Sequence, residues 1–211
     1  MFMKMMTNNI KWNFKNKDVL VVGSSRGIGK GIFDEFKSNG AKVLGIDSSI
    51  CDISCESQID TYFKAINNID ILINVAAINH TKKIEDINIE EWDDVLDVNL
   101  RSFFYIIKKT LKVMPRGSKI VNVSSIAGRH RSLVSGVHYV SSKAGIIGLT
   151  RQLAYELGSK NINVNVVCPS QTMTDMLKKS MSEKELEHLS KKIPLKRIAS
   201  VREQVYTVMF L

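Results

Sequence analysis

The stretch Leu20–Gly31, LVVGSSRGIGKG, joins a short apolar run to an amphipathic one through a glycine-rich loop. A strand that leads through such a loop into a helix can hold phosphate, because the free N–H groups and the dipole at a helix N-terminus favour anions. Two kinds of phosphate come into question: the end of a nucleoside triphosphate and the bridging pyrophosphate of a dinucleotide. The spacing of the glycines separates them.

A triphosphate loop has the pattern G-x-x-x-x-G-K-[ST]. Gly29 and Lys30 match its end, but Ser24 stands where the first glycine is needed. Gly31 follows the lysine, so the hydroxyl that would bind magnesium is missing. The sequence therefore departs from a triphosphate loop at two positions.

The dinucleotide fingerprint G-x-G-x-x-G also fails, because Ile32 stands at its third glycine when the pattern starts at Gly27. Gly23, Gly27 and Gly29 instead form the spacing G-x-x-x-G-x-G. Gly23 permits a sharp exit from the strand, and the other two let a phosphate approach the backbone at the helix start. This spacing favours a dinucleotide loop, and a tight turn without a ligand is the alternative.

A second strand pattern, KVLGID, ends in Asp47, about 20 residues past the glycine loop. A carboxylate there can accept hydrogen bonds from both ribose hydroxyls of the adenosine half and would repel a 2′-phosphate. Asp47 therefore favours NAD(H) over NADP(H). Arg26 argues the other way, because its guanidinium can meet a 2′-phosphate. A turn or cap role for Asp47 is the alternative that needs no ligand.

Apolar runs alternate with helical patterns along the whole chain, which is typical of a parallel sheet built from βαβ units. Strands are predicted over residues 18–22, 42–46, 70–74, 119–124 and 163–167. Helices are predicted over residues 28–38, 56–67, 90–112, 137–158, 174–190 and 201–210. The strands are mostly continuous apolar runs, as expected for strands covered on both faces. The predicted fold is α/β, with a parallel, doubly wound sheet flanked by helices.

A chain of 211 residues with 44% hydrophobic and 24% charged residues suits one globular domain. We expect this domain to span residues 17–211, after an N-terminal extension over residues 1–16. No window approaches the roughly 18 apolar residues of a membrane span, and the N-terminus lacks the features of a signal peptide. The composition therefore predicts a cytoplasmic protein without a membrane partner.

Three cysteines, Cys51, Cys55 and Cys168, form an odd and sparse set, which indicates a reducing compartment. No His or Cys cluster accompanies Cys51 and Cys55, so no metal site is predicted. The formal charge of +9 is compatible with nucleic-acid binding. Because the basic residues are scattered without interleaved aromatics, we instead predict a lysine-rich surface and no nucleic-acid partner.

The segment VHYVSSKAG places Tyr139 and Lys143 one helical turn apart on the same face. A free tyrosine has a pKa of about 10, too high for a base at neutral pH. A nearby ammonium group favours the phenolate and lowers that pKa. The pair is therefore a candidate for acid–base chemistry.

Polar residues near this pair in the predicted fold complete the candidate site. Ser124 and Ser125 close the strand at 119–124, at the edge where open α/β sheets bind their ligands. Asn99 lies amid apolar neighbours in the predicted helix 90–112, so we expect its amide to be buried and paired.

Together these motifs resemble the short-chain dehydrogenase/reductase family, in its common single-domain branch, over residues 17–211. The resemblance implies a three-layer Rossmann fold and an NAD(P)-dependent oxidoreductase. Asn99, Ser125, Tyr139 and Lys143 match the family's catalytic tetrad. In the implied mechanism a hydride passes between nicotinamide and a carbonyl or carbinol carbon, and Tyr139 transfers the proton at oxygen.

The resemblance also implies the roles of the other three residues. Lys143 holds the cofactor ribose and lowers the tyrosine pKa, Ser125 binds the substrate oxygen, and Asn99 holds a water behind the lysine. Ser124 remains an alternative catalytic serine, because the spacing from Ser125 to Tyr139 is one residue longer than in the family.

The family's motifs further imply the cofactor contacts. Asp52 matches an acidic residue near adenine, the segment INVAAI matches Asn-Asn-Ala-Gly, and Thr174 matches a threonine that meets the nicotinamide carboxamide. The implied cofactor-binding residues are Gly23, Ser25, Arg26, Gly27, Ile28, Gly29, Asp47, Asp52, Ile53, Asn74, Ala76, Tyr139, Lys143, Pro169, Thr172 and Thr174.

The sequence departs from the family in a few places. Val22, Val75, Ala77 and Ser170 replace a threonine, an asparagine and two glycines, and we expect modest effects. The usual last strand and tail are absent after IPLKRIASVREQVYTVMFL, so the predicted strand 163–167 should form a sheet edge.

Residues 172–198 are charged and rich in methionine, and we expect them to form a mobile lid over the substrate. Basic residues there and nearby would form a positive rim that attracts an anionic substrate, with solvated lysines as the alternative. They are Arg129, Arg131, Lys178, Lys179, Lys191, Lys192 and Arg197.

The predicted function is hydride transfer to or from a small alcohol or carbonyl compound, of 3-oxoacyl or sugar and polyol type. A catalytically impaired nucleotide-binding or interaction protein is the alternative, suggested by the absent C-terminal segment. The helices predicted at 90–112 and 137–158 are expected to form the isologous contact of a homodimer or homotetramer.

Overall fold

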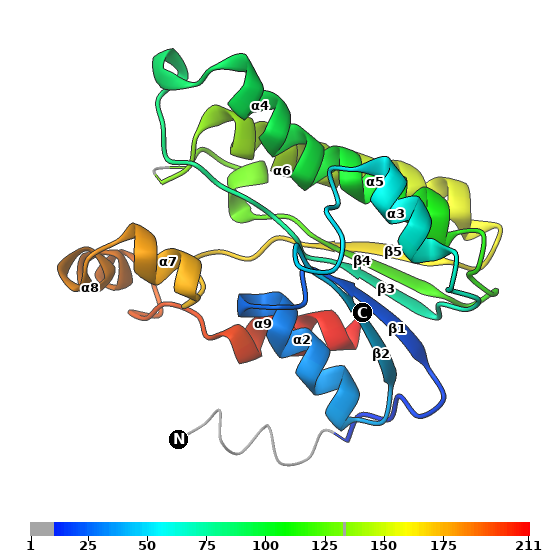
Figure 1. Ribbon diagram of the computed structural model, residues 1–211. Helices are drawn as coiled ribbons and strands as arrows, with labels where there is room; N and C mark the ends of the chain where they lie inside the picture. The colour runs from blue at the N-terminus through cyan, green and yellow to red at the C-terminus, as the bar shows by residue number, and fades with distance from the viewer. Residues whose placement is uncertain (1–10, 133) are drawn as a thin grey trace.

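The computed structural model describes residues 11–132 and 134–211. These residues form one parallel sheet with the strand order β2-β1-β3-β4-β5 (Figure 1). The strands are β1 (Asp18–Val22), β2 (Lys42–Ile46), β3 (Ile71–Asn74), β4 (Lys119–Val123) and β5 (Asn163–Val167). The chain steps outward from β1 to β2 and then crosses back to β3, so the order reverses beside β1. This confirms the predicted doubly wound α/β fold.

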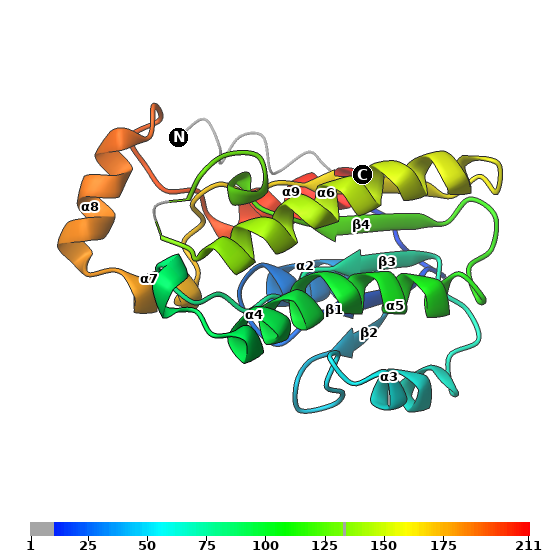
Figure 2. The same cartoon turned by 90° about the horizontal axis from the view of Figure 1, so that it is seen from above.

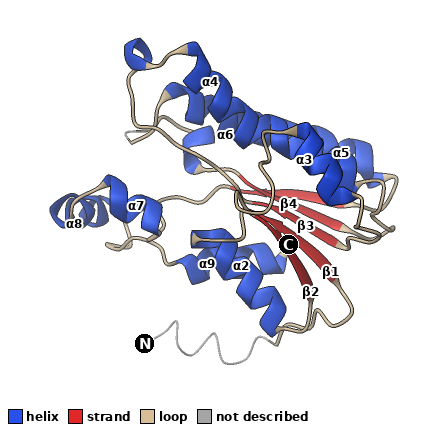
Figure 3. Cartoon of the chain, in the orientation of Figure 1, coloured by secondary structure: helices blue, strands red, loops and turns tan. Residues whose placement is uncertain are grey.

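Helices cover both faces of the sheet, as Figure 3 shows in the same orientation. One side holds α2 (Gly27–Ser38) and α9 (Val201–Phe210), and the other holds α3 (Glu56–Phe63), α4 (Ile89–Leu96), α5 (Ser102–Thr110) and α6 (Val137–Gly158). The ranges of α6 and α9 agree with the prediction, whereas α3 ends earlier than predicted. Among the residues that the structure describes, no helix is long and apolar enough to cross a membrane.

Alternating residues of β1 divide the core into two layers. Val19 and Val21 pack in the cluster that includes residues of α2 and α9. Leu20 and Val22 pack in the cluster on the opposite face, with residues of α3, α5 and α6. All four side chains are fully buried, which explains the continuous apolar run in the sequence.

The described part of the predicted N-terminal extension, residues 11–16, packs against the domain. The Phe14 ring lies 4.6 Å from that of Phe36, centre to centre. The backbone N–H of Phe14 donates to the Asn39 carbonyl at 3.0 Å. Residues 1–10 of that extension lie outside the described residues.

The helix predicted over residues 90–112 is confirmed as a continuous helical segment from Ile89 to Thr110, but a π-helical segment that was not predicted, Asp97–Arg101, joins α4 to α5. Such segments insert an extra residue per turn and are often found at functional sites. Asn99 lies in this segment, is fully buried and hydrogen-bonds both backbone groups of Ile78. Phe104, part of the apolar stripe of this helix, remains 51% exposed.

The helix predicted over residues 174–190 is wrong, since the chain forms α7 (Asp175–Ser180) and α8 (Glu183–Lys192) instead. Met181 between them is extended, and Ser182 starts the second helix by a reciprocal capping box with Glu185. Figure 2 shows α8 at the outer end of the molecule, away from the sheet.

Candidate active site

A cavity of about 1000 Å³ lies at the carboxyl ends of the strands, where open α/β sheets bind their ligands. Most of the residues predicted from the sequence line it. They are Gly23, Ser25, Arg26, Gly27, Ile28, Gly29, Asp47, Asp52, Ile53, Ala76, Ser125, Tyr139, Lys143, Pro169, Thr172 and Thr174. Asn74 and Asn99 are not part of the lining.

The glycine loop has the geometry of an anion cradle. Gly23 has a φ of +93°, and a Cβ there would lie 2.7 Å from the backbone nitrogen of Ala76. A Cβ at Gly29 would lie 1.9 Å from the carbonyl oxygen of Gly23. A glycine at position 29 is therefore required by the packing of two parts of the loop, and the approach of a phosphate there stays a prediction.

The N-terminus of α2 closes the loop and faces the cavity. Its N-cap residue, Arg26, makes no side-chain hydrogen bond to the first turn, and that turn holds no acidic residue. The N–H groups of this turn are thus not capped by the N-cap side chain, and with the helix dipole they favour an anion. The loop fits the pyrophosphate of a dinucleotide.

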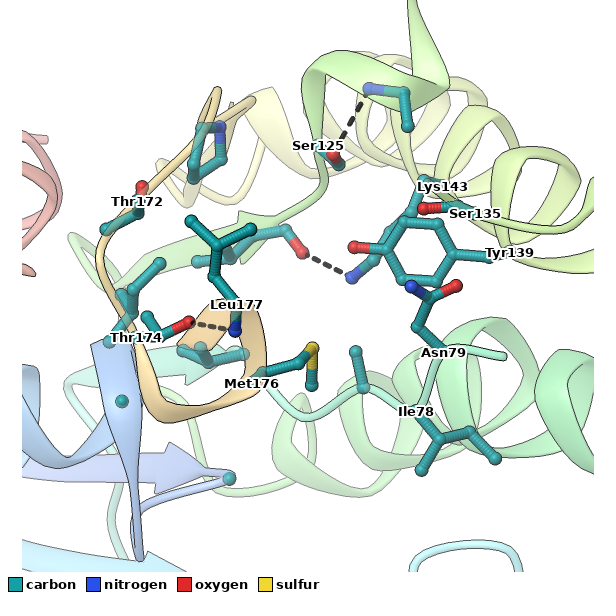
Figure 4. Close-up of a pocket in the computed structure, with 18 of the residues that line it drawn as sticks. Ile78, Asn79, Ser125, Ser135, Tyr139, Lys143, Thr172, Thr174, Met176 and Leu177 are labelled. Atoms are coloured by element: carbon teal, nitrogen blue, oxygen red, sulfur yellow. Dashed lines mark hydrogen bonds between the residues drawn. The ribbon is translucent and has the colours of Figure 1, made fainter. Parts of the chain in front are cut away.

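The candidate catalytic residues converge on the other end of the cavity (Figure 4). Tyr139 lies in the first turn of α6, and Lys143 follows one turn later with 2% exposure. The Lys143 Nζ lies 5.6 Å from the centre of the Tyr139 ring and donates to the carbonyl of Val123 at 3.1 Å. The side chains of Ser125 and Tyr139 both line this end of the cavity.

Comparison with known proteins leads to the family that the sequence motifs resemble. Residues 45–211 match the family model described as Enoyl-(Acyl carrier protein) reductase. The 3-oxoacyl-[acyl-carrier-protein] reductase FabG of Vibrio cholerae is 32% identical, over 94% of this chain and 91% of that protein. The aldohexose dehydrogenase (AldT) of Thermoplasma acidophilum has a TM-score of 0.84 and 30% identity, covering 94% of this chain and 87% of that one. A short chain dehydrogenase family protein from Francisella tularensis gives a TM-score of 0.84 at 29% identity, with 92% and 90% covered.

The chain belongs to the short-chain dehydrogenase/reductase family. It is therefore an NAD(P)-dependent oxidoreductase with a Rossmann-type fold, as the resemblance implied.

Asp47 has the turn role that the sequence left as one alternative, and it also lies at the cavity, where the ribose contact stays a prediction. Its Oδ1 accepts hydrogen bonds from the Ser49 N–H at 2.9 Å and from the Ser49 hydroxyl at 2.6 Å. These bonds lower the pKa of Asp47, so the carboxylate is charged at neutral pH. Asp47 shapes the turn after β2 and also lines the cavity, as does the exposed Arg26 across the loop.

The predicted lowering of the tyrosine pKa by Lys143 is not found. Burial raises the pKa of Tyr139, and the hydrogen bond with Ser125 opposes that rise only in part. Burial also lowers the pKa of Lys143 to about 7, so the ammonium loses much of its charge near neutrality. A half-neutral amine that faces the ring of Tyr139 stabilises the phenolate little.

The two candidate serines have different surroundings. The buried Ser124 donates its hydroxyl to the carbonyl oxygen of Lys143 at 2.7 Å. The Ser125 Oγ accepts from the Ala127 N–H at 3.1 Å and keeps its proton for a further partner. The geometry therefore favours Ser125 as the residue that meets a substrate oxygen.

Asn99 reaches the catalytic helix through a residue that the sequence analysis missed. Its Nδ2 donates to the Ser142 Oγ at 3.1 Å, and that hydroxyl donates to the carbonyl of Tyr139 at 2.8 Å. Ser142 stands three residues after Tyr139, and this helical spacing is the signal that could have revealed it. Asn99 thus ties the loop at Ile78 to the first turn of α6.

Asn74, predicted as a cofactor contact, is buried within the sheet. Its Nδ2 donates to the Asn122 Oδ1 at 2.9 Å, across the register pair that the two residues form between β3 and β4. Asn122 in turn donates to Thr150 of α6 at 3.0 Å. The Asn74 Nδ2 is therefore paired between the strands, whereas its Oδ1 has no hydrogen-bond partner among the described residues.

Replacing Lys143 with methionine is expected to change how stability depends on pH. Burial lowers the pKa of Lys143 from 10.5 to about 7, so between these values the unfolded chain binds more protons than the folded one. The free energy of unfolding of the wild type should rise with pH relative to K143M, by at most about 1.4 kcal/mol per pH unit. Urea unfolding of both proteins between about pH 6 and pH 9 measures this. A constant difference between them would show that Lys143 keeps an ordinary pKa.

Proposed function

We propose that this protein transfers a hydride between NAD(H) and a small carbonyl or alcohol compound, with Tyr139 as the general acid and base. The observation that carries the proposal is the convergence of Tyr139, Ser125 and Lys143 on the cavity that the glycine loop also lines. When bound, the nicotinamide supplies or accepts the hydride. The phenol of Tyr139 gives or takes the proton at the substrate oxygen, which the Ser125 hydroxyl holds in place.

Lys143 and Asn99 support this proton transfer through their contacts with Tyr139 and its helical turn. The buried amine of Lys143 lies beside the Tyr139 ring and would bind ribose hydroxyls, which would also restore its charge by supplying acceptors. Asn99 fixes the backbone of the Tyr139 turn through Ser142. The position of Lys143 supports the ribose contact that the resemblance implied, whereas the water implied behind the lysine at Asn99 stays a prediction.

We propose residues 172–198 as the substrate lid. Met176 and Leu177 of α7 face Tyr139 across the cavity in Figure 4. Farther out, α8 lines the same cavity with Lys184, His188 and Lys192, which are spaced by four residues and so share one helix face. This face favours a substrate that joins an apolar part to an anionic group.

Of the basic residues predicted to form a rim, only some lie at the cavity. Arg131 and Lys192 line it. Arg197 instead pairs with Glu203 at the start of α9, with an N···O distance of 2.7 Å. The positive wall therefore comes from the loop before α6 and from α8.

A substrate panel tests the proposed function. The Vibrio cholerae relative is named for 3-oxoacyl substrates and the Thermoplasma acidophilum relative for an aldohexose, so the panel pairs a 3-oxoacyl thioester with aldohexoses and their phosphates. NADH consumption or formation is followed with each. Binding of NADH without turnover of any member would favour the alternative, a nucleotide-binding protein without catalysis. An enoyl thioester included in the panel detects reduction of a carbon–carbon double bond.

The preference for NAD(H) is expected to depend on Asp47. Its carboxylate would repel a 2′-phosphate. D47N should therefore lower the ratio of kcat/KM with NADH to kcat/KM with NADPH by about tenfold or more. Ratios of kcat/KM for the two cofactors measure the effect. Asp34 provides the control, because D34N removes an exposed carboxylate of α2 that does not line the cavity. A wild type that prefers NADPH would show that Arg26 prevails over Asp47.

We also propose that copies of the chain associate into a homodimer or homotetramer through α5 and α6. Phe104 and Tyr155 are 51% and 85% exposed on these helices, and a second copy of the chain would cover them. The mass of the protein in solution tests the association. The cytoplasmic location stays a prediction.

A further inference from the structure

A buried histidine stands directly before the candidate catalytic tyrosine. His138 is fully buried, and its Nδ1 accepts a hydrogen bond from the backbone N–H of Tyr139 at 2.8 Å. That N–H belongs to the first turn of α6, where N–H groups have no partner within the helix. A side chain at the N-cap would ordinarily accept it, but the N-cap is Gly136 and makes no such bond. The imidazole of His138 does so instead.

The absence of a side chain at Gly136 makes room for the His138 ring. A Cβ at this position would lie 2.5 Å from Cε1 and 2.9 Å from Nδ1 of His138. The ring therefore occupies the space that an N-cap side chain would fill. The two residues together cap the helix that carries Tyr139.

The far side of the ring faces a carboxylate. The His138 Nε2 lies 3.6 Å from the Glu91 Oε1 of α4, and among the described residues both buried atoms lack a hydrogen-bond partner. Because Nδ1 accepts a hydrogen bond, the neutral ring carries its proton on Nε2, directed at Glu91. The other oxygen of Glu91 accepts from Lys82 at 2.5 Å, and His80 lies 4.0 Å from Oε1. A chain of polar contacts thus runs from Lys82 through Glu91 and His138 to the backbone of Tyr139.

We propose that His138, held by Glu91, is a positioning residue for Tyr139. By capping the Tyr139 N–H it fixes the first turn of α6, and with it the direction of the phenol toward Ser125 and the substrate oxygen. This inference rests on the proposed role of Tyr139 as the acid and base. A small displacement of such a group costs activity, because proton transfer requires hydrogen-bond contact in the reacting geometry.

Two variants of nearly equal shape isolate the hydrogen bond. In H138N the Oδ1 can accept from the Tyr139 N–H much as Nδ1 does, whereas H138L has no acceptor. We expect H138L to lose about 10- to 100-fold in kcat and H138N to stay within about threefold of the wild type. The affinity for NADH should change little in either. The limb of the pH profile of kcat that reports the titration of Tyr139 should shift in H138L relative to the wild type. In H138N it should keep the wild-type position.

The controls separate a positioning role from a structural one. Thermal unfolding and active-site titration with NADH give the folded fraction, so that kcat is expressed per folded molecule. A loss of stability in H138L with unchanged kcat and pH profile would overturn the proposal, as would an equal loss of kcat in H138N and H138L. If H138L does not fold, E91Q takes its place. It keeps the size of Glu91 without its charge, and we expect the same shift, so an unchanged profile there would also overturn the proposal.

The variant Y139F keeps this test distinct from that of the proposed function. If Y139F is inactive and H138L behaves like the wild type, the positioning role of His138 is refuted and the catalytic role of Tyr139 is supported. If Y139F is as active as the wild type, the proposed function itself is wrong.

Discussion

The Tyr139→Phe variant is expected to lose about 1000-fold in kcat, since it removes the proton that a general acid would deliver to the substrate oxygen. Its affinity for NADH should stay within a few-fold of the wild type, because the ring remains and the glycine loop is untouched. Steady-state kinetics with the best substrate of the panel gives kcat, and quenching of protein fluorescence by NADH gives the affinity.

The same helix offers a matched control for this variant. Tyr155 also belongs to α6 but is 85% exposed and does not line the cavity, so Y155F makes the same chemical change away from the site. It should keep wild-type kcat. Normal turnover by Y139F would refute the assignment of the acid and base, and loss of NADH binding would show that the tyrosine serves the cofactor instead.

The Gly29→Ala variant is expected to lose at least about 100-fold in NADH affinity, because phosphate binding at a helix start depends on the loop's backbone. A Cβ at this position would lie 1.9 Å from the Gly23 carbonyl oxygen, so the loop or the start of α2 must shift. Overpacking of this kind also costs about 1–3 kcal/mol of stability. Isothermal titration with NADH and urea unfolding measure the two effects.

Gly148 supplies the control for this substitution. It lies inside α6, and a Cβ there would meet nothing within 4 Å. G148A should therefore bind NADH normally and gain roughly 0.5–1 kcal/mol in stability, since alanine is the better helix former. If G29A binds NADH as tightly as G148A does, the packing of the loop is not what holds the cofactor.

The fold could be predicted because local patterns determine it. Runs such as Val19–Val22 are apolar throughout because both faces of the sheet are covered, and the structure confirms the strand Asp18–Val22 at the predicted residues. The ends of α6 and the start of α9 were likewise predictable, since glycines bound α6 and a serine precedes α9. The interruptions within the helices predicted over residues 90–112 and 174–190 could not be predicted from the sequence. Asp97–Arg101 becomes π-helical where the buried amide of Asn99 hydrogen-bonds the distant backbone of Ile78, and no pattern of hydropathy records such a contact.

The sequence by itself determined which kind of ligand the glycine loop suits and which pair of residues lies on one face of α6, because both depend on short spacings along the chain. Only the tertiary structure decided how these groups are charged and held. Burial raises the pKa of Tyr139 and lowers that of Lys143, so the expected lowering of the tyrosine pKa by the lysine is not found. His138 serves as a helix cap only because Gly136 leaves room for its ring and α4 places Glu91 beside it. Burial and contacts between distant segments are properties of the folded chain, so spacing alone cannot reveal them.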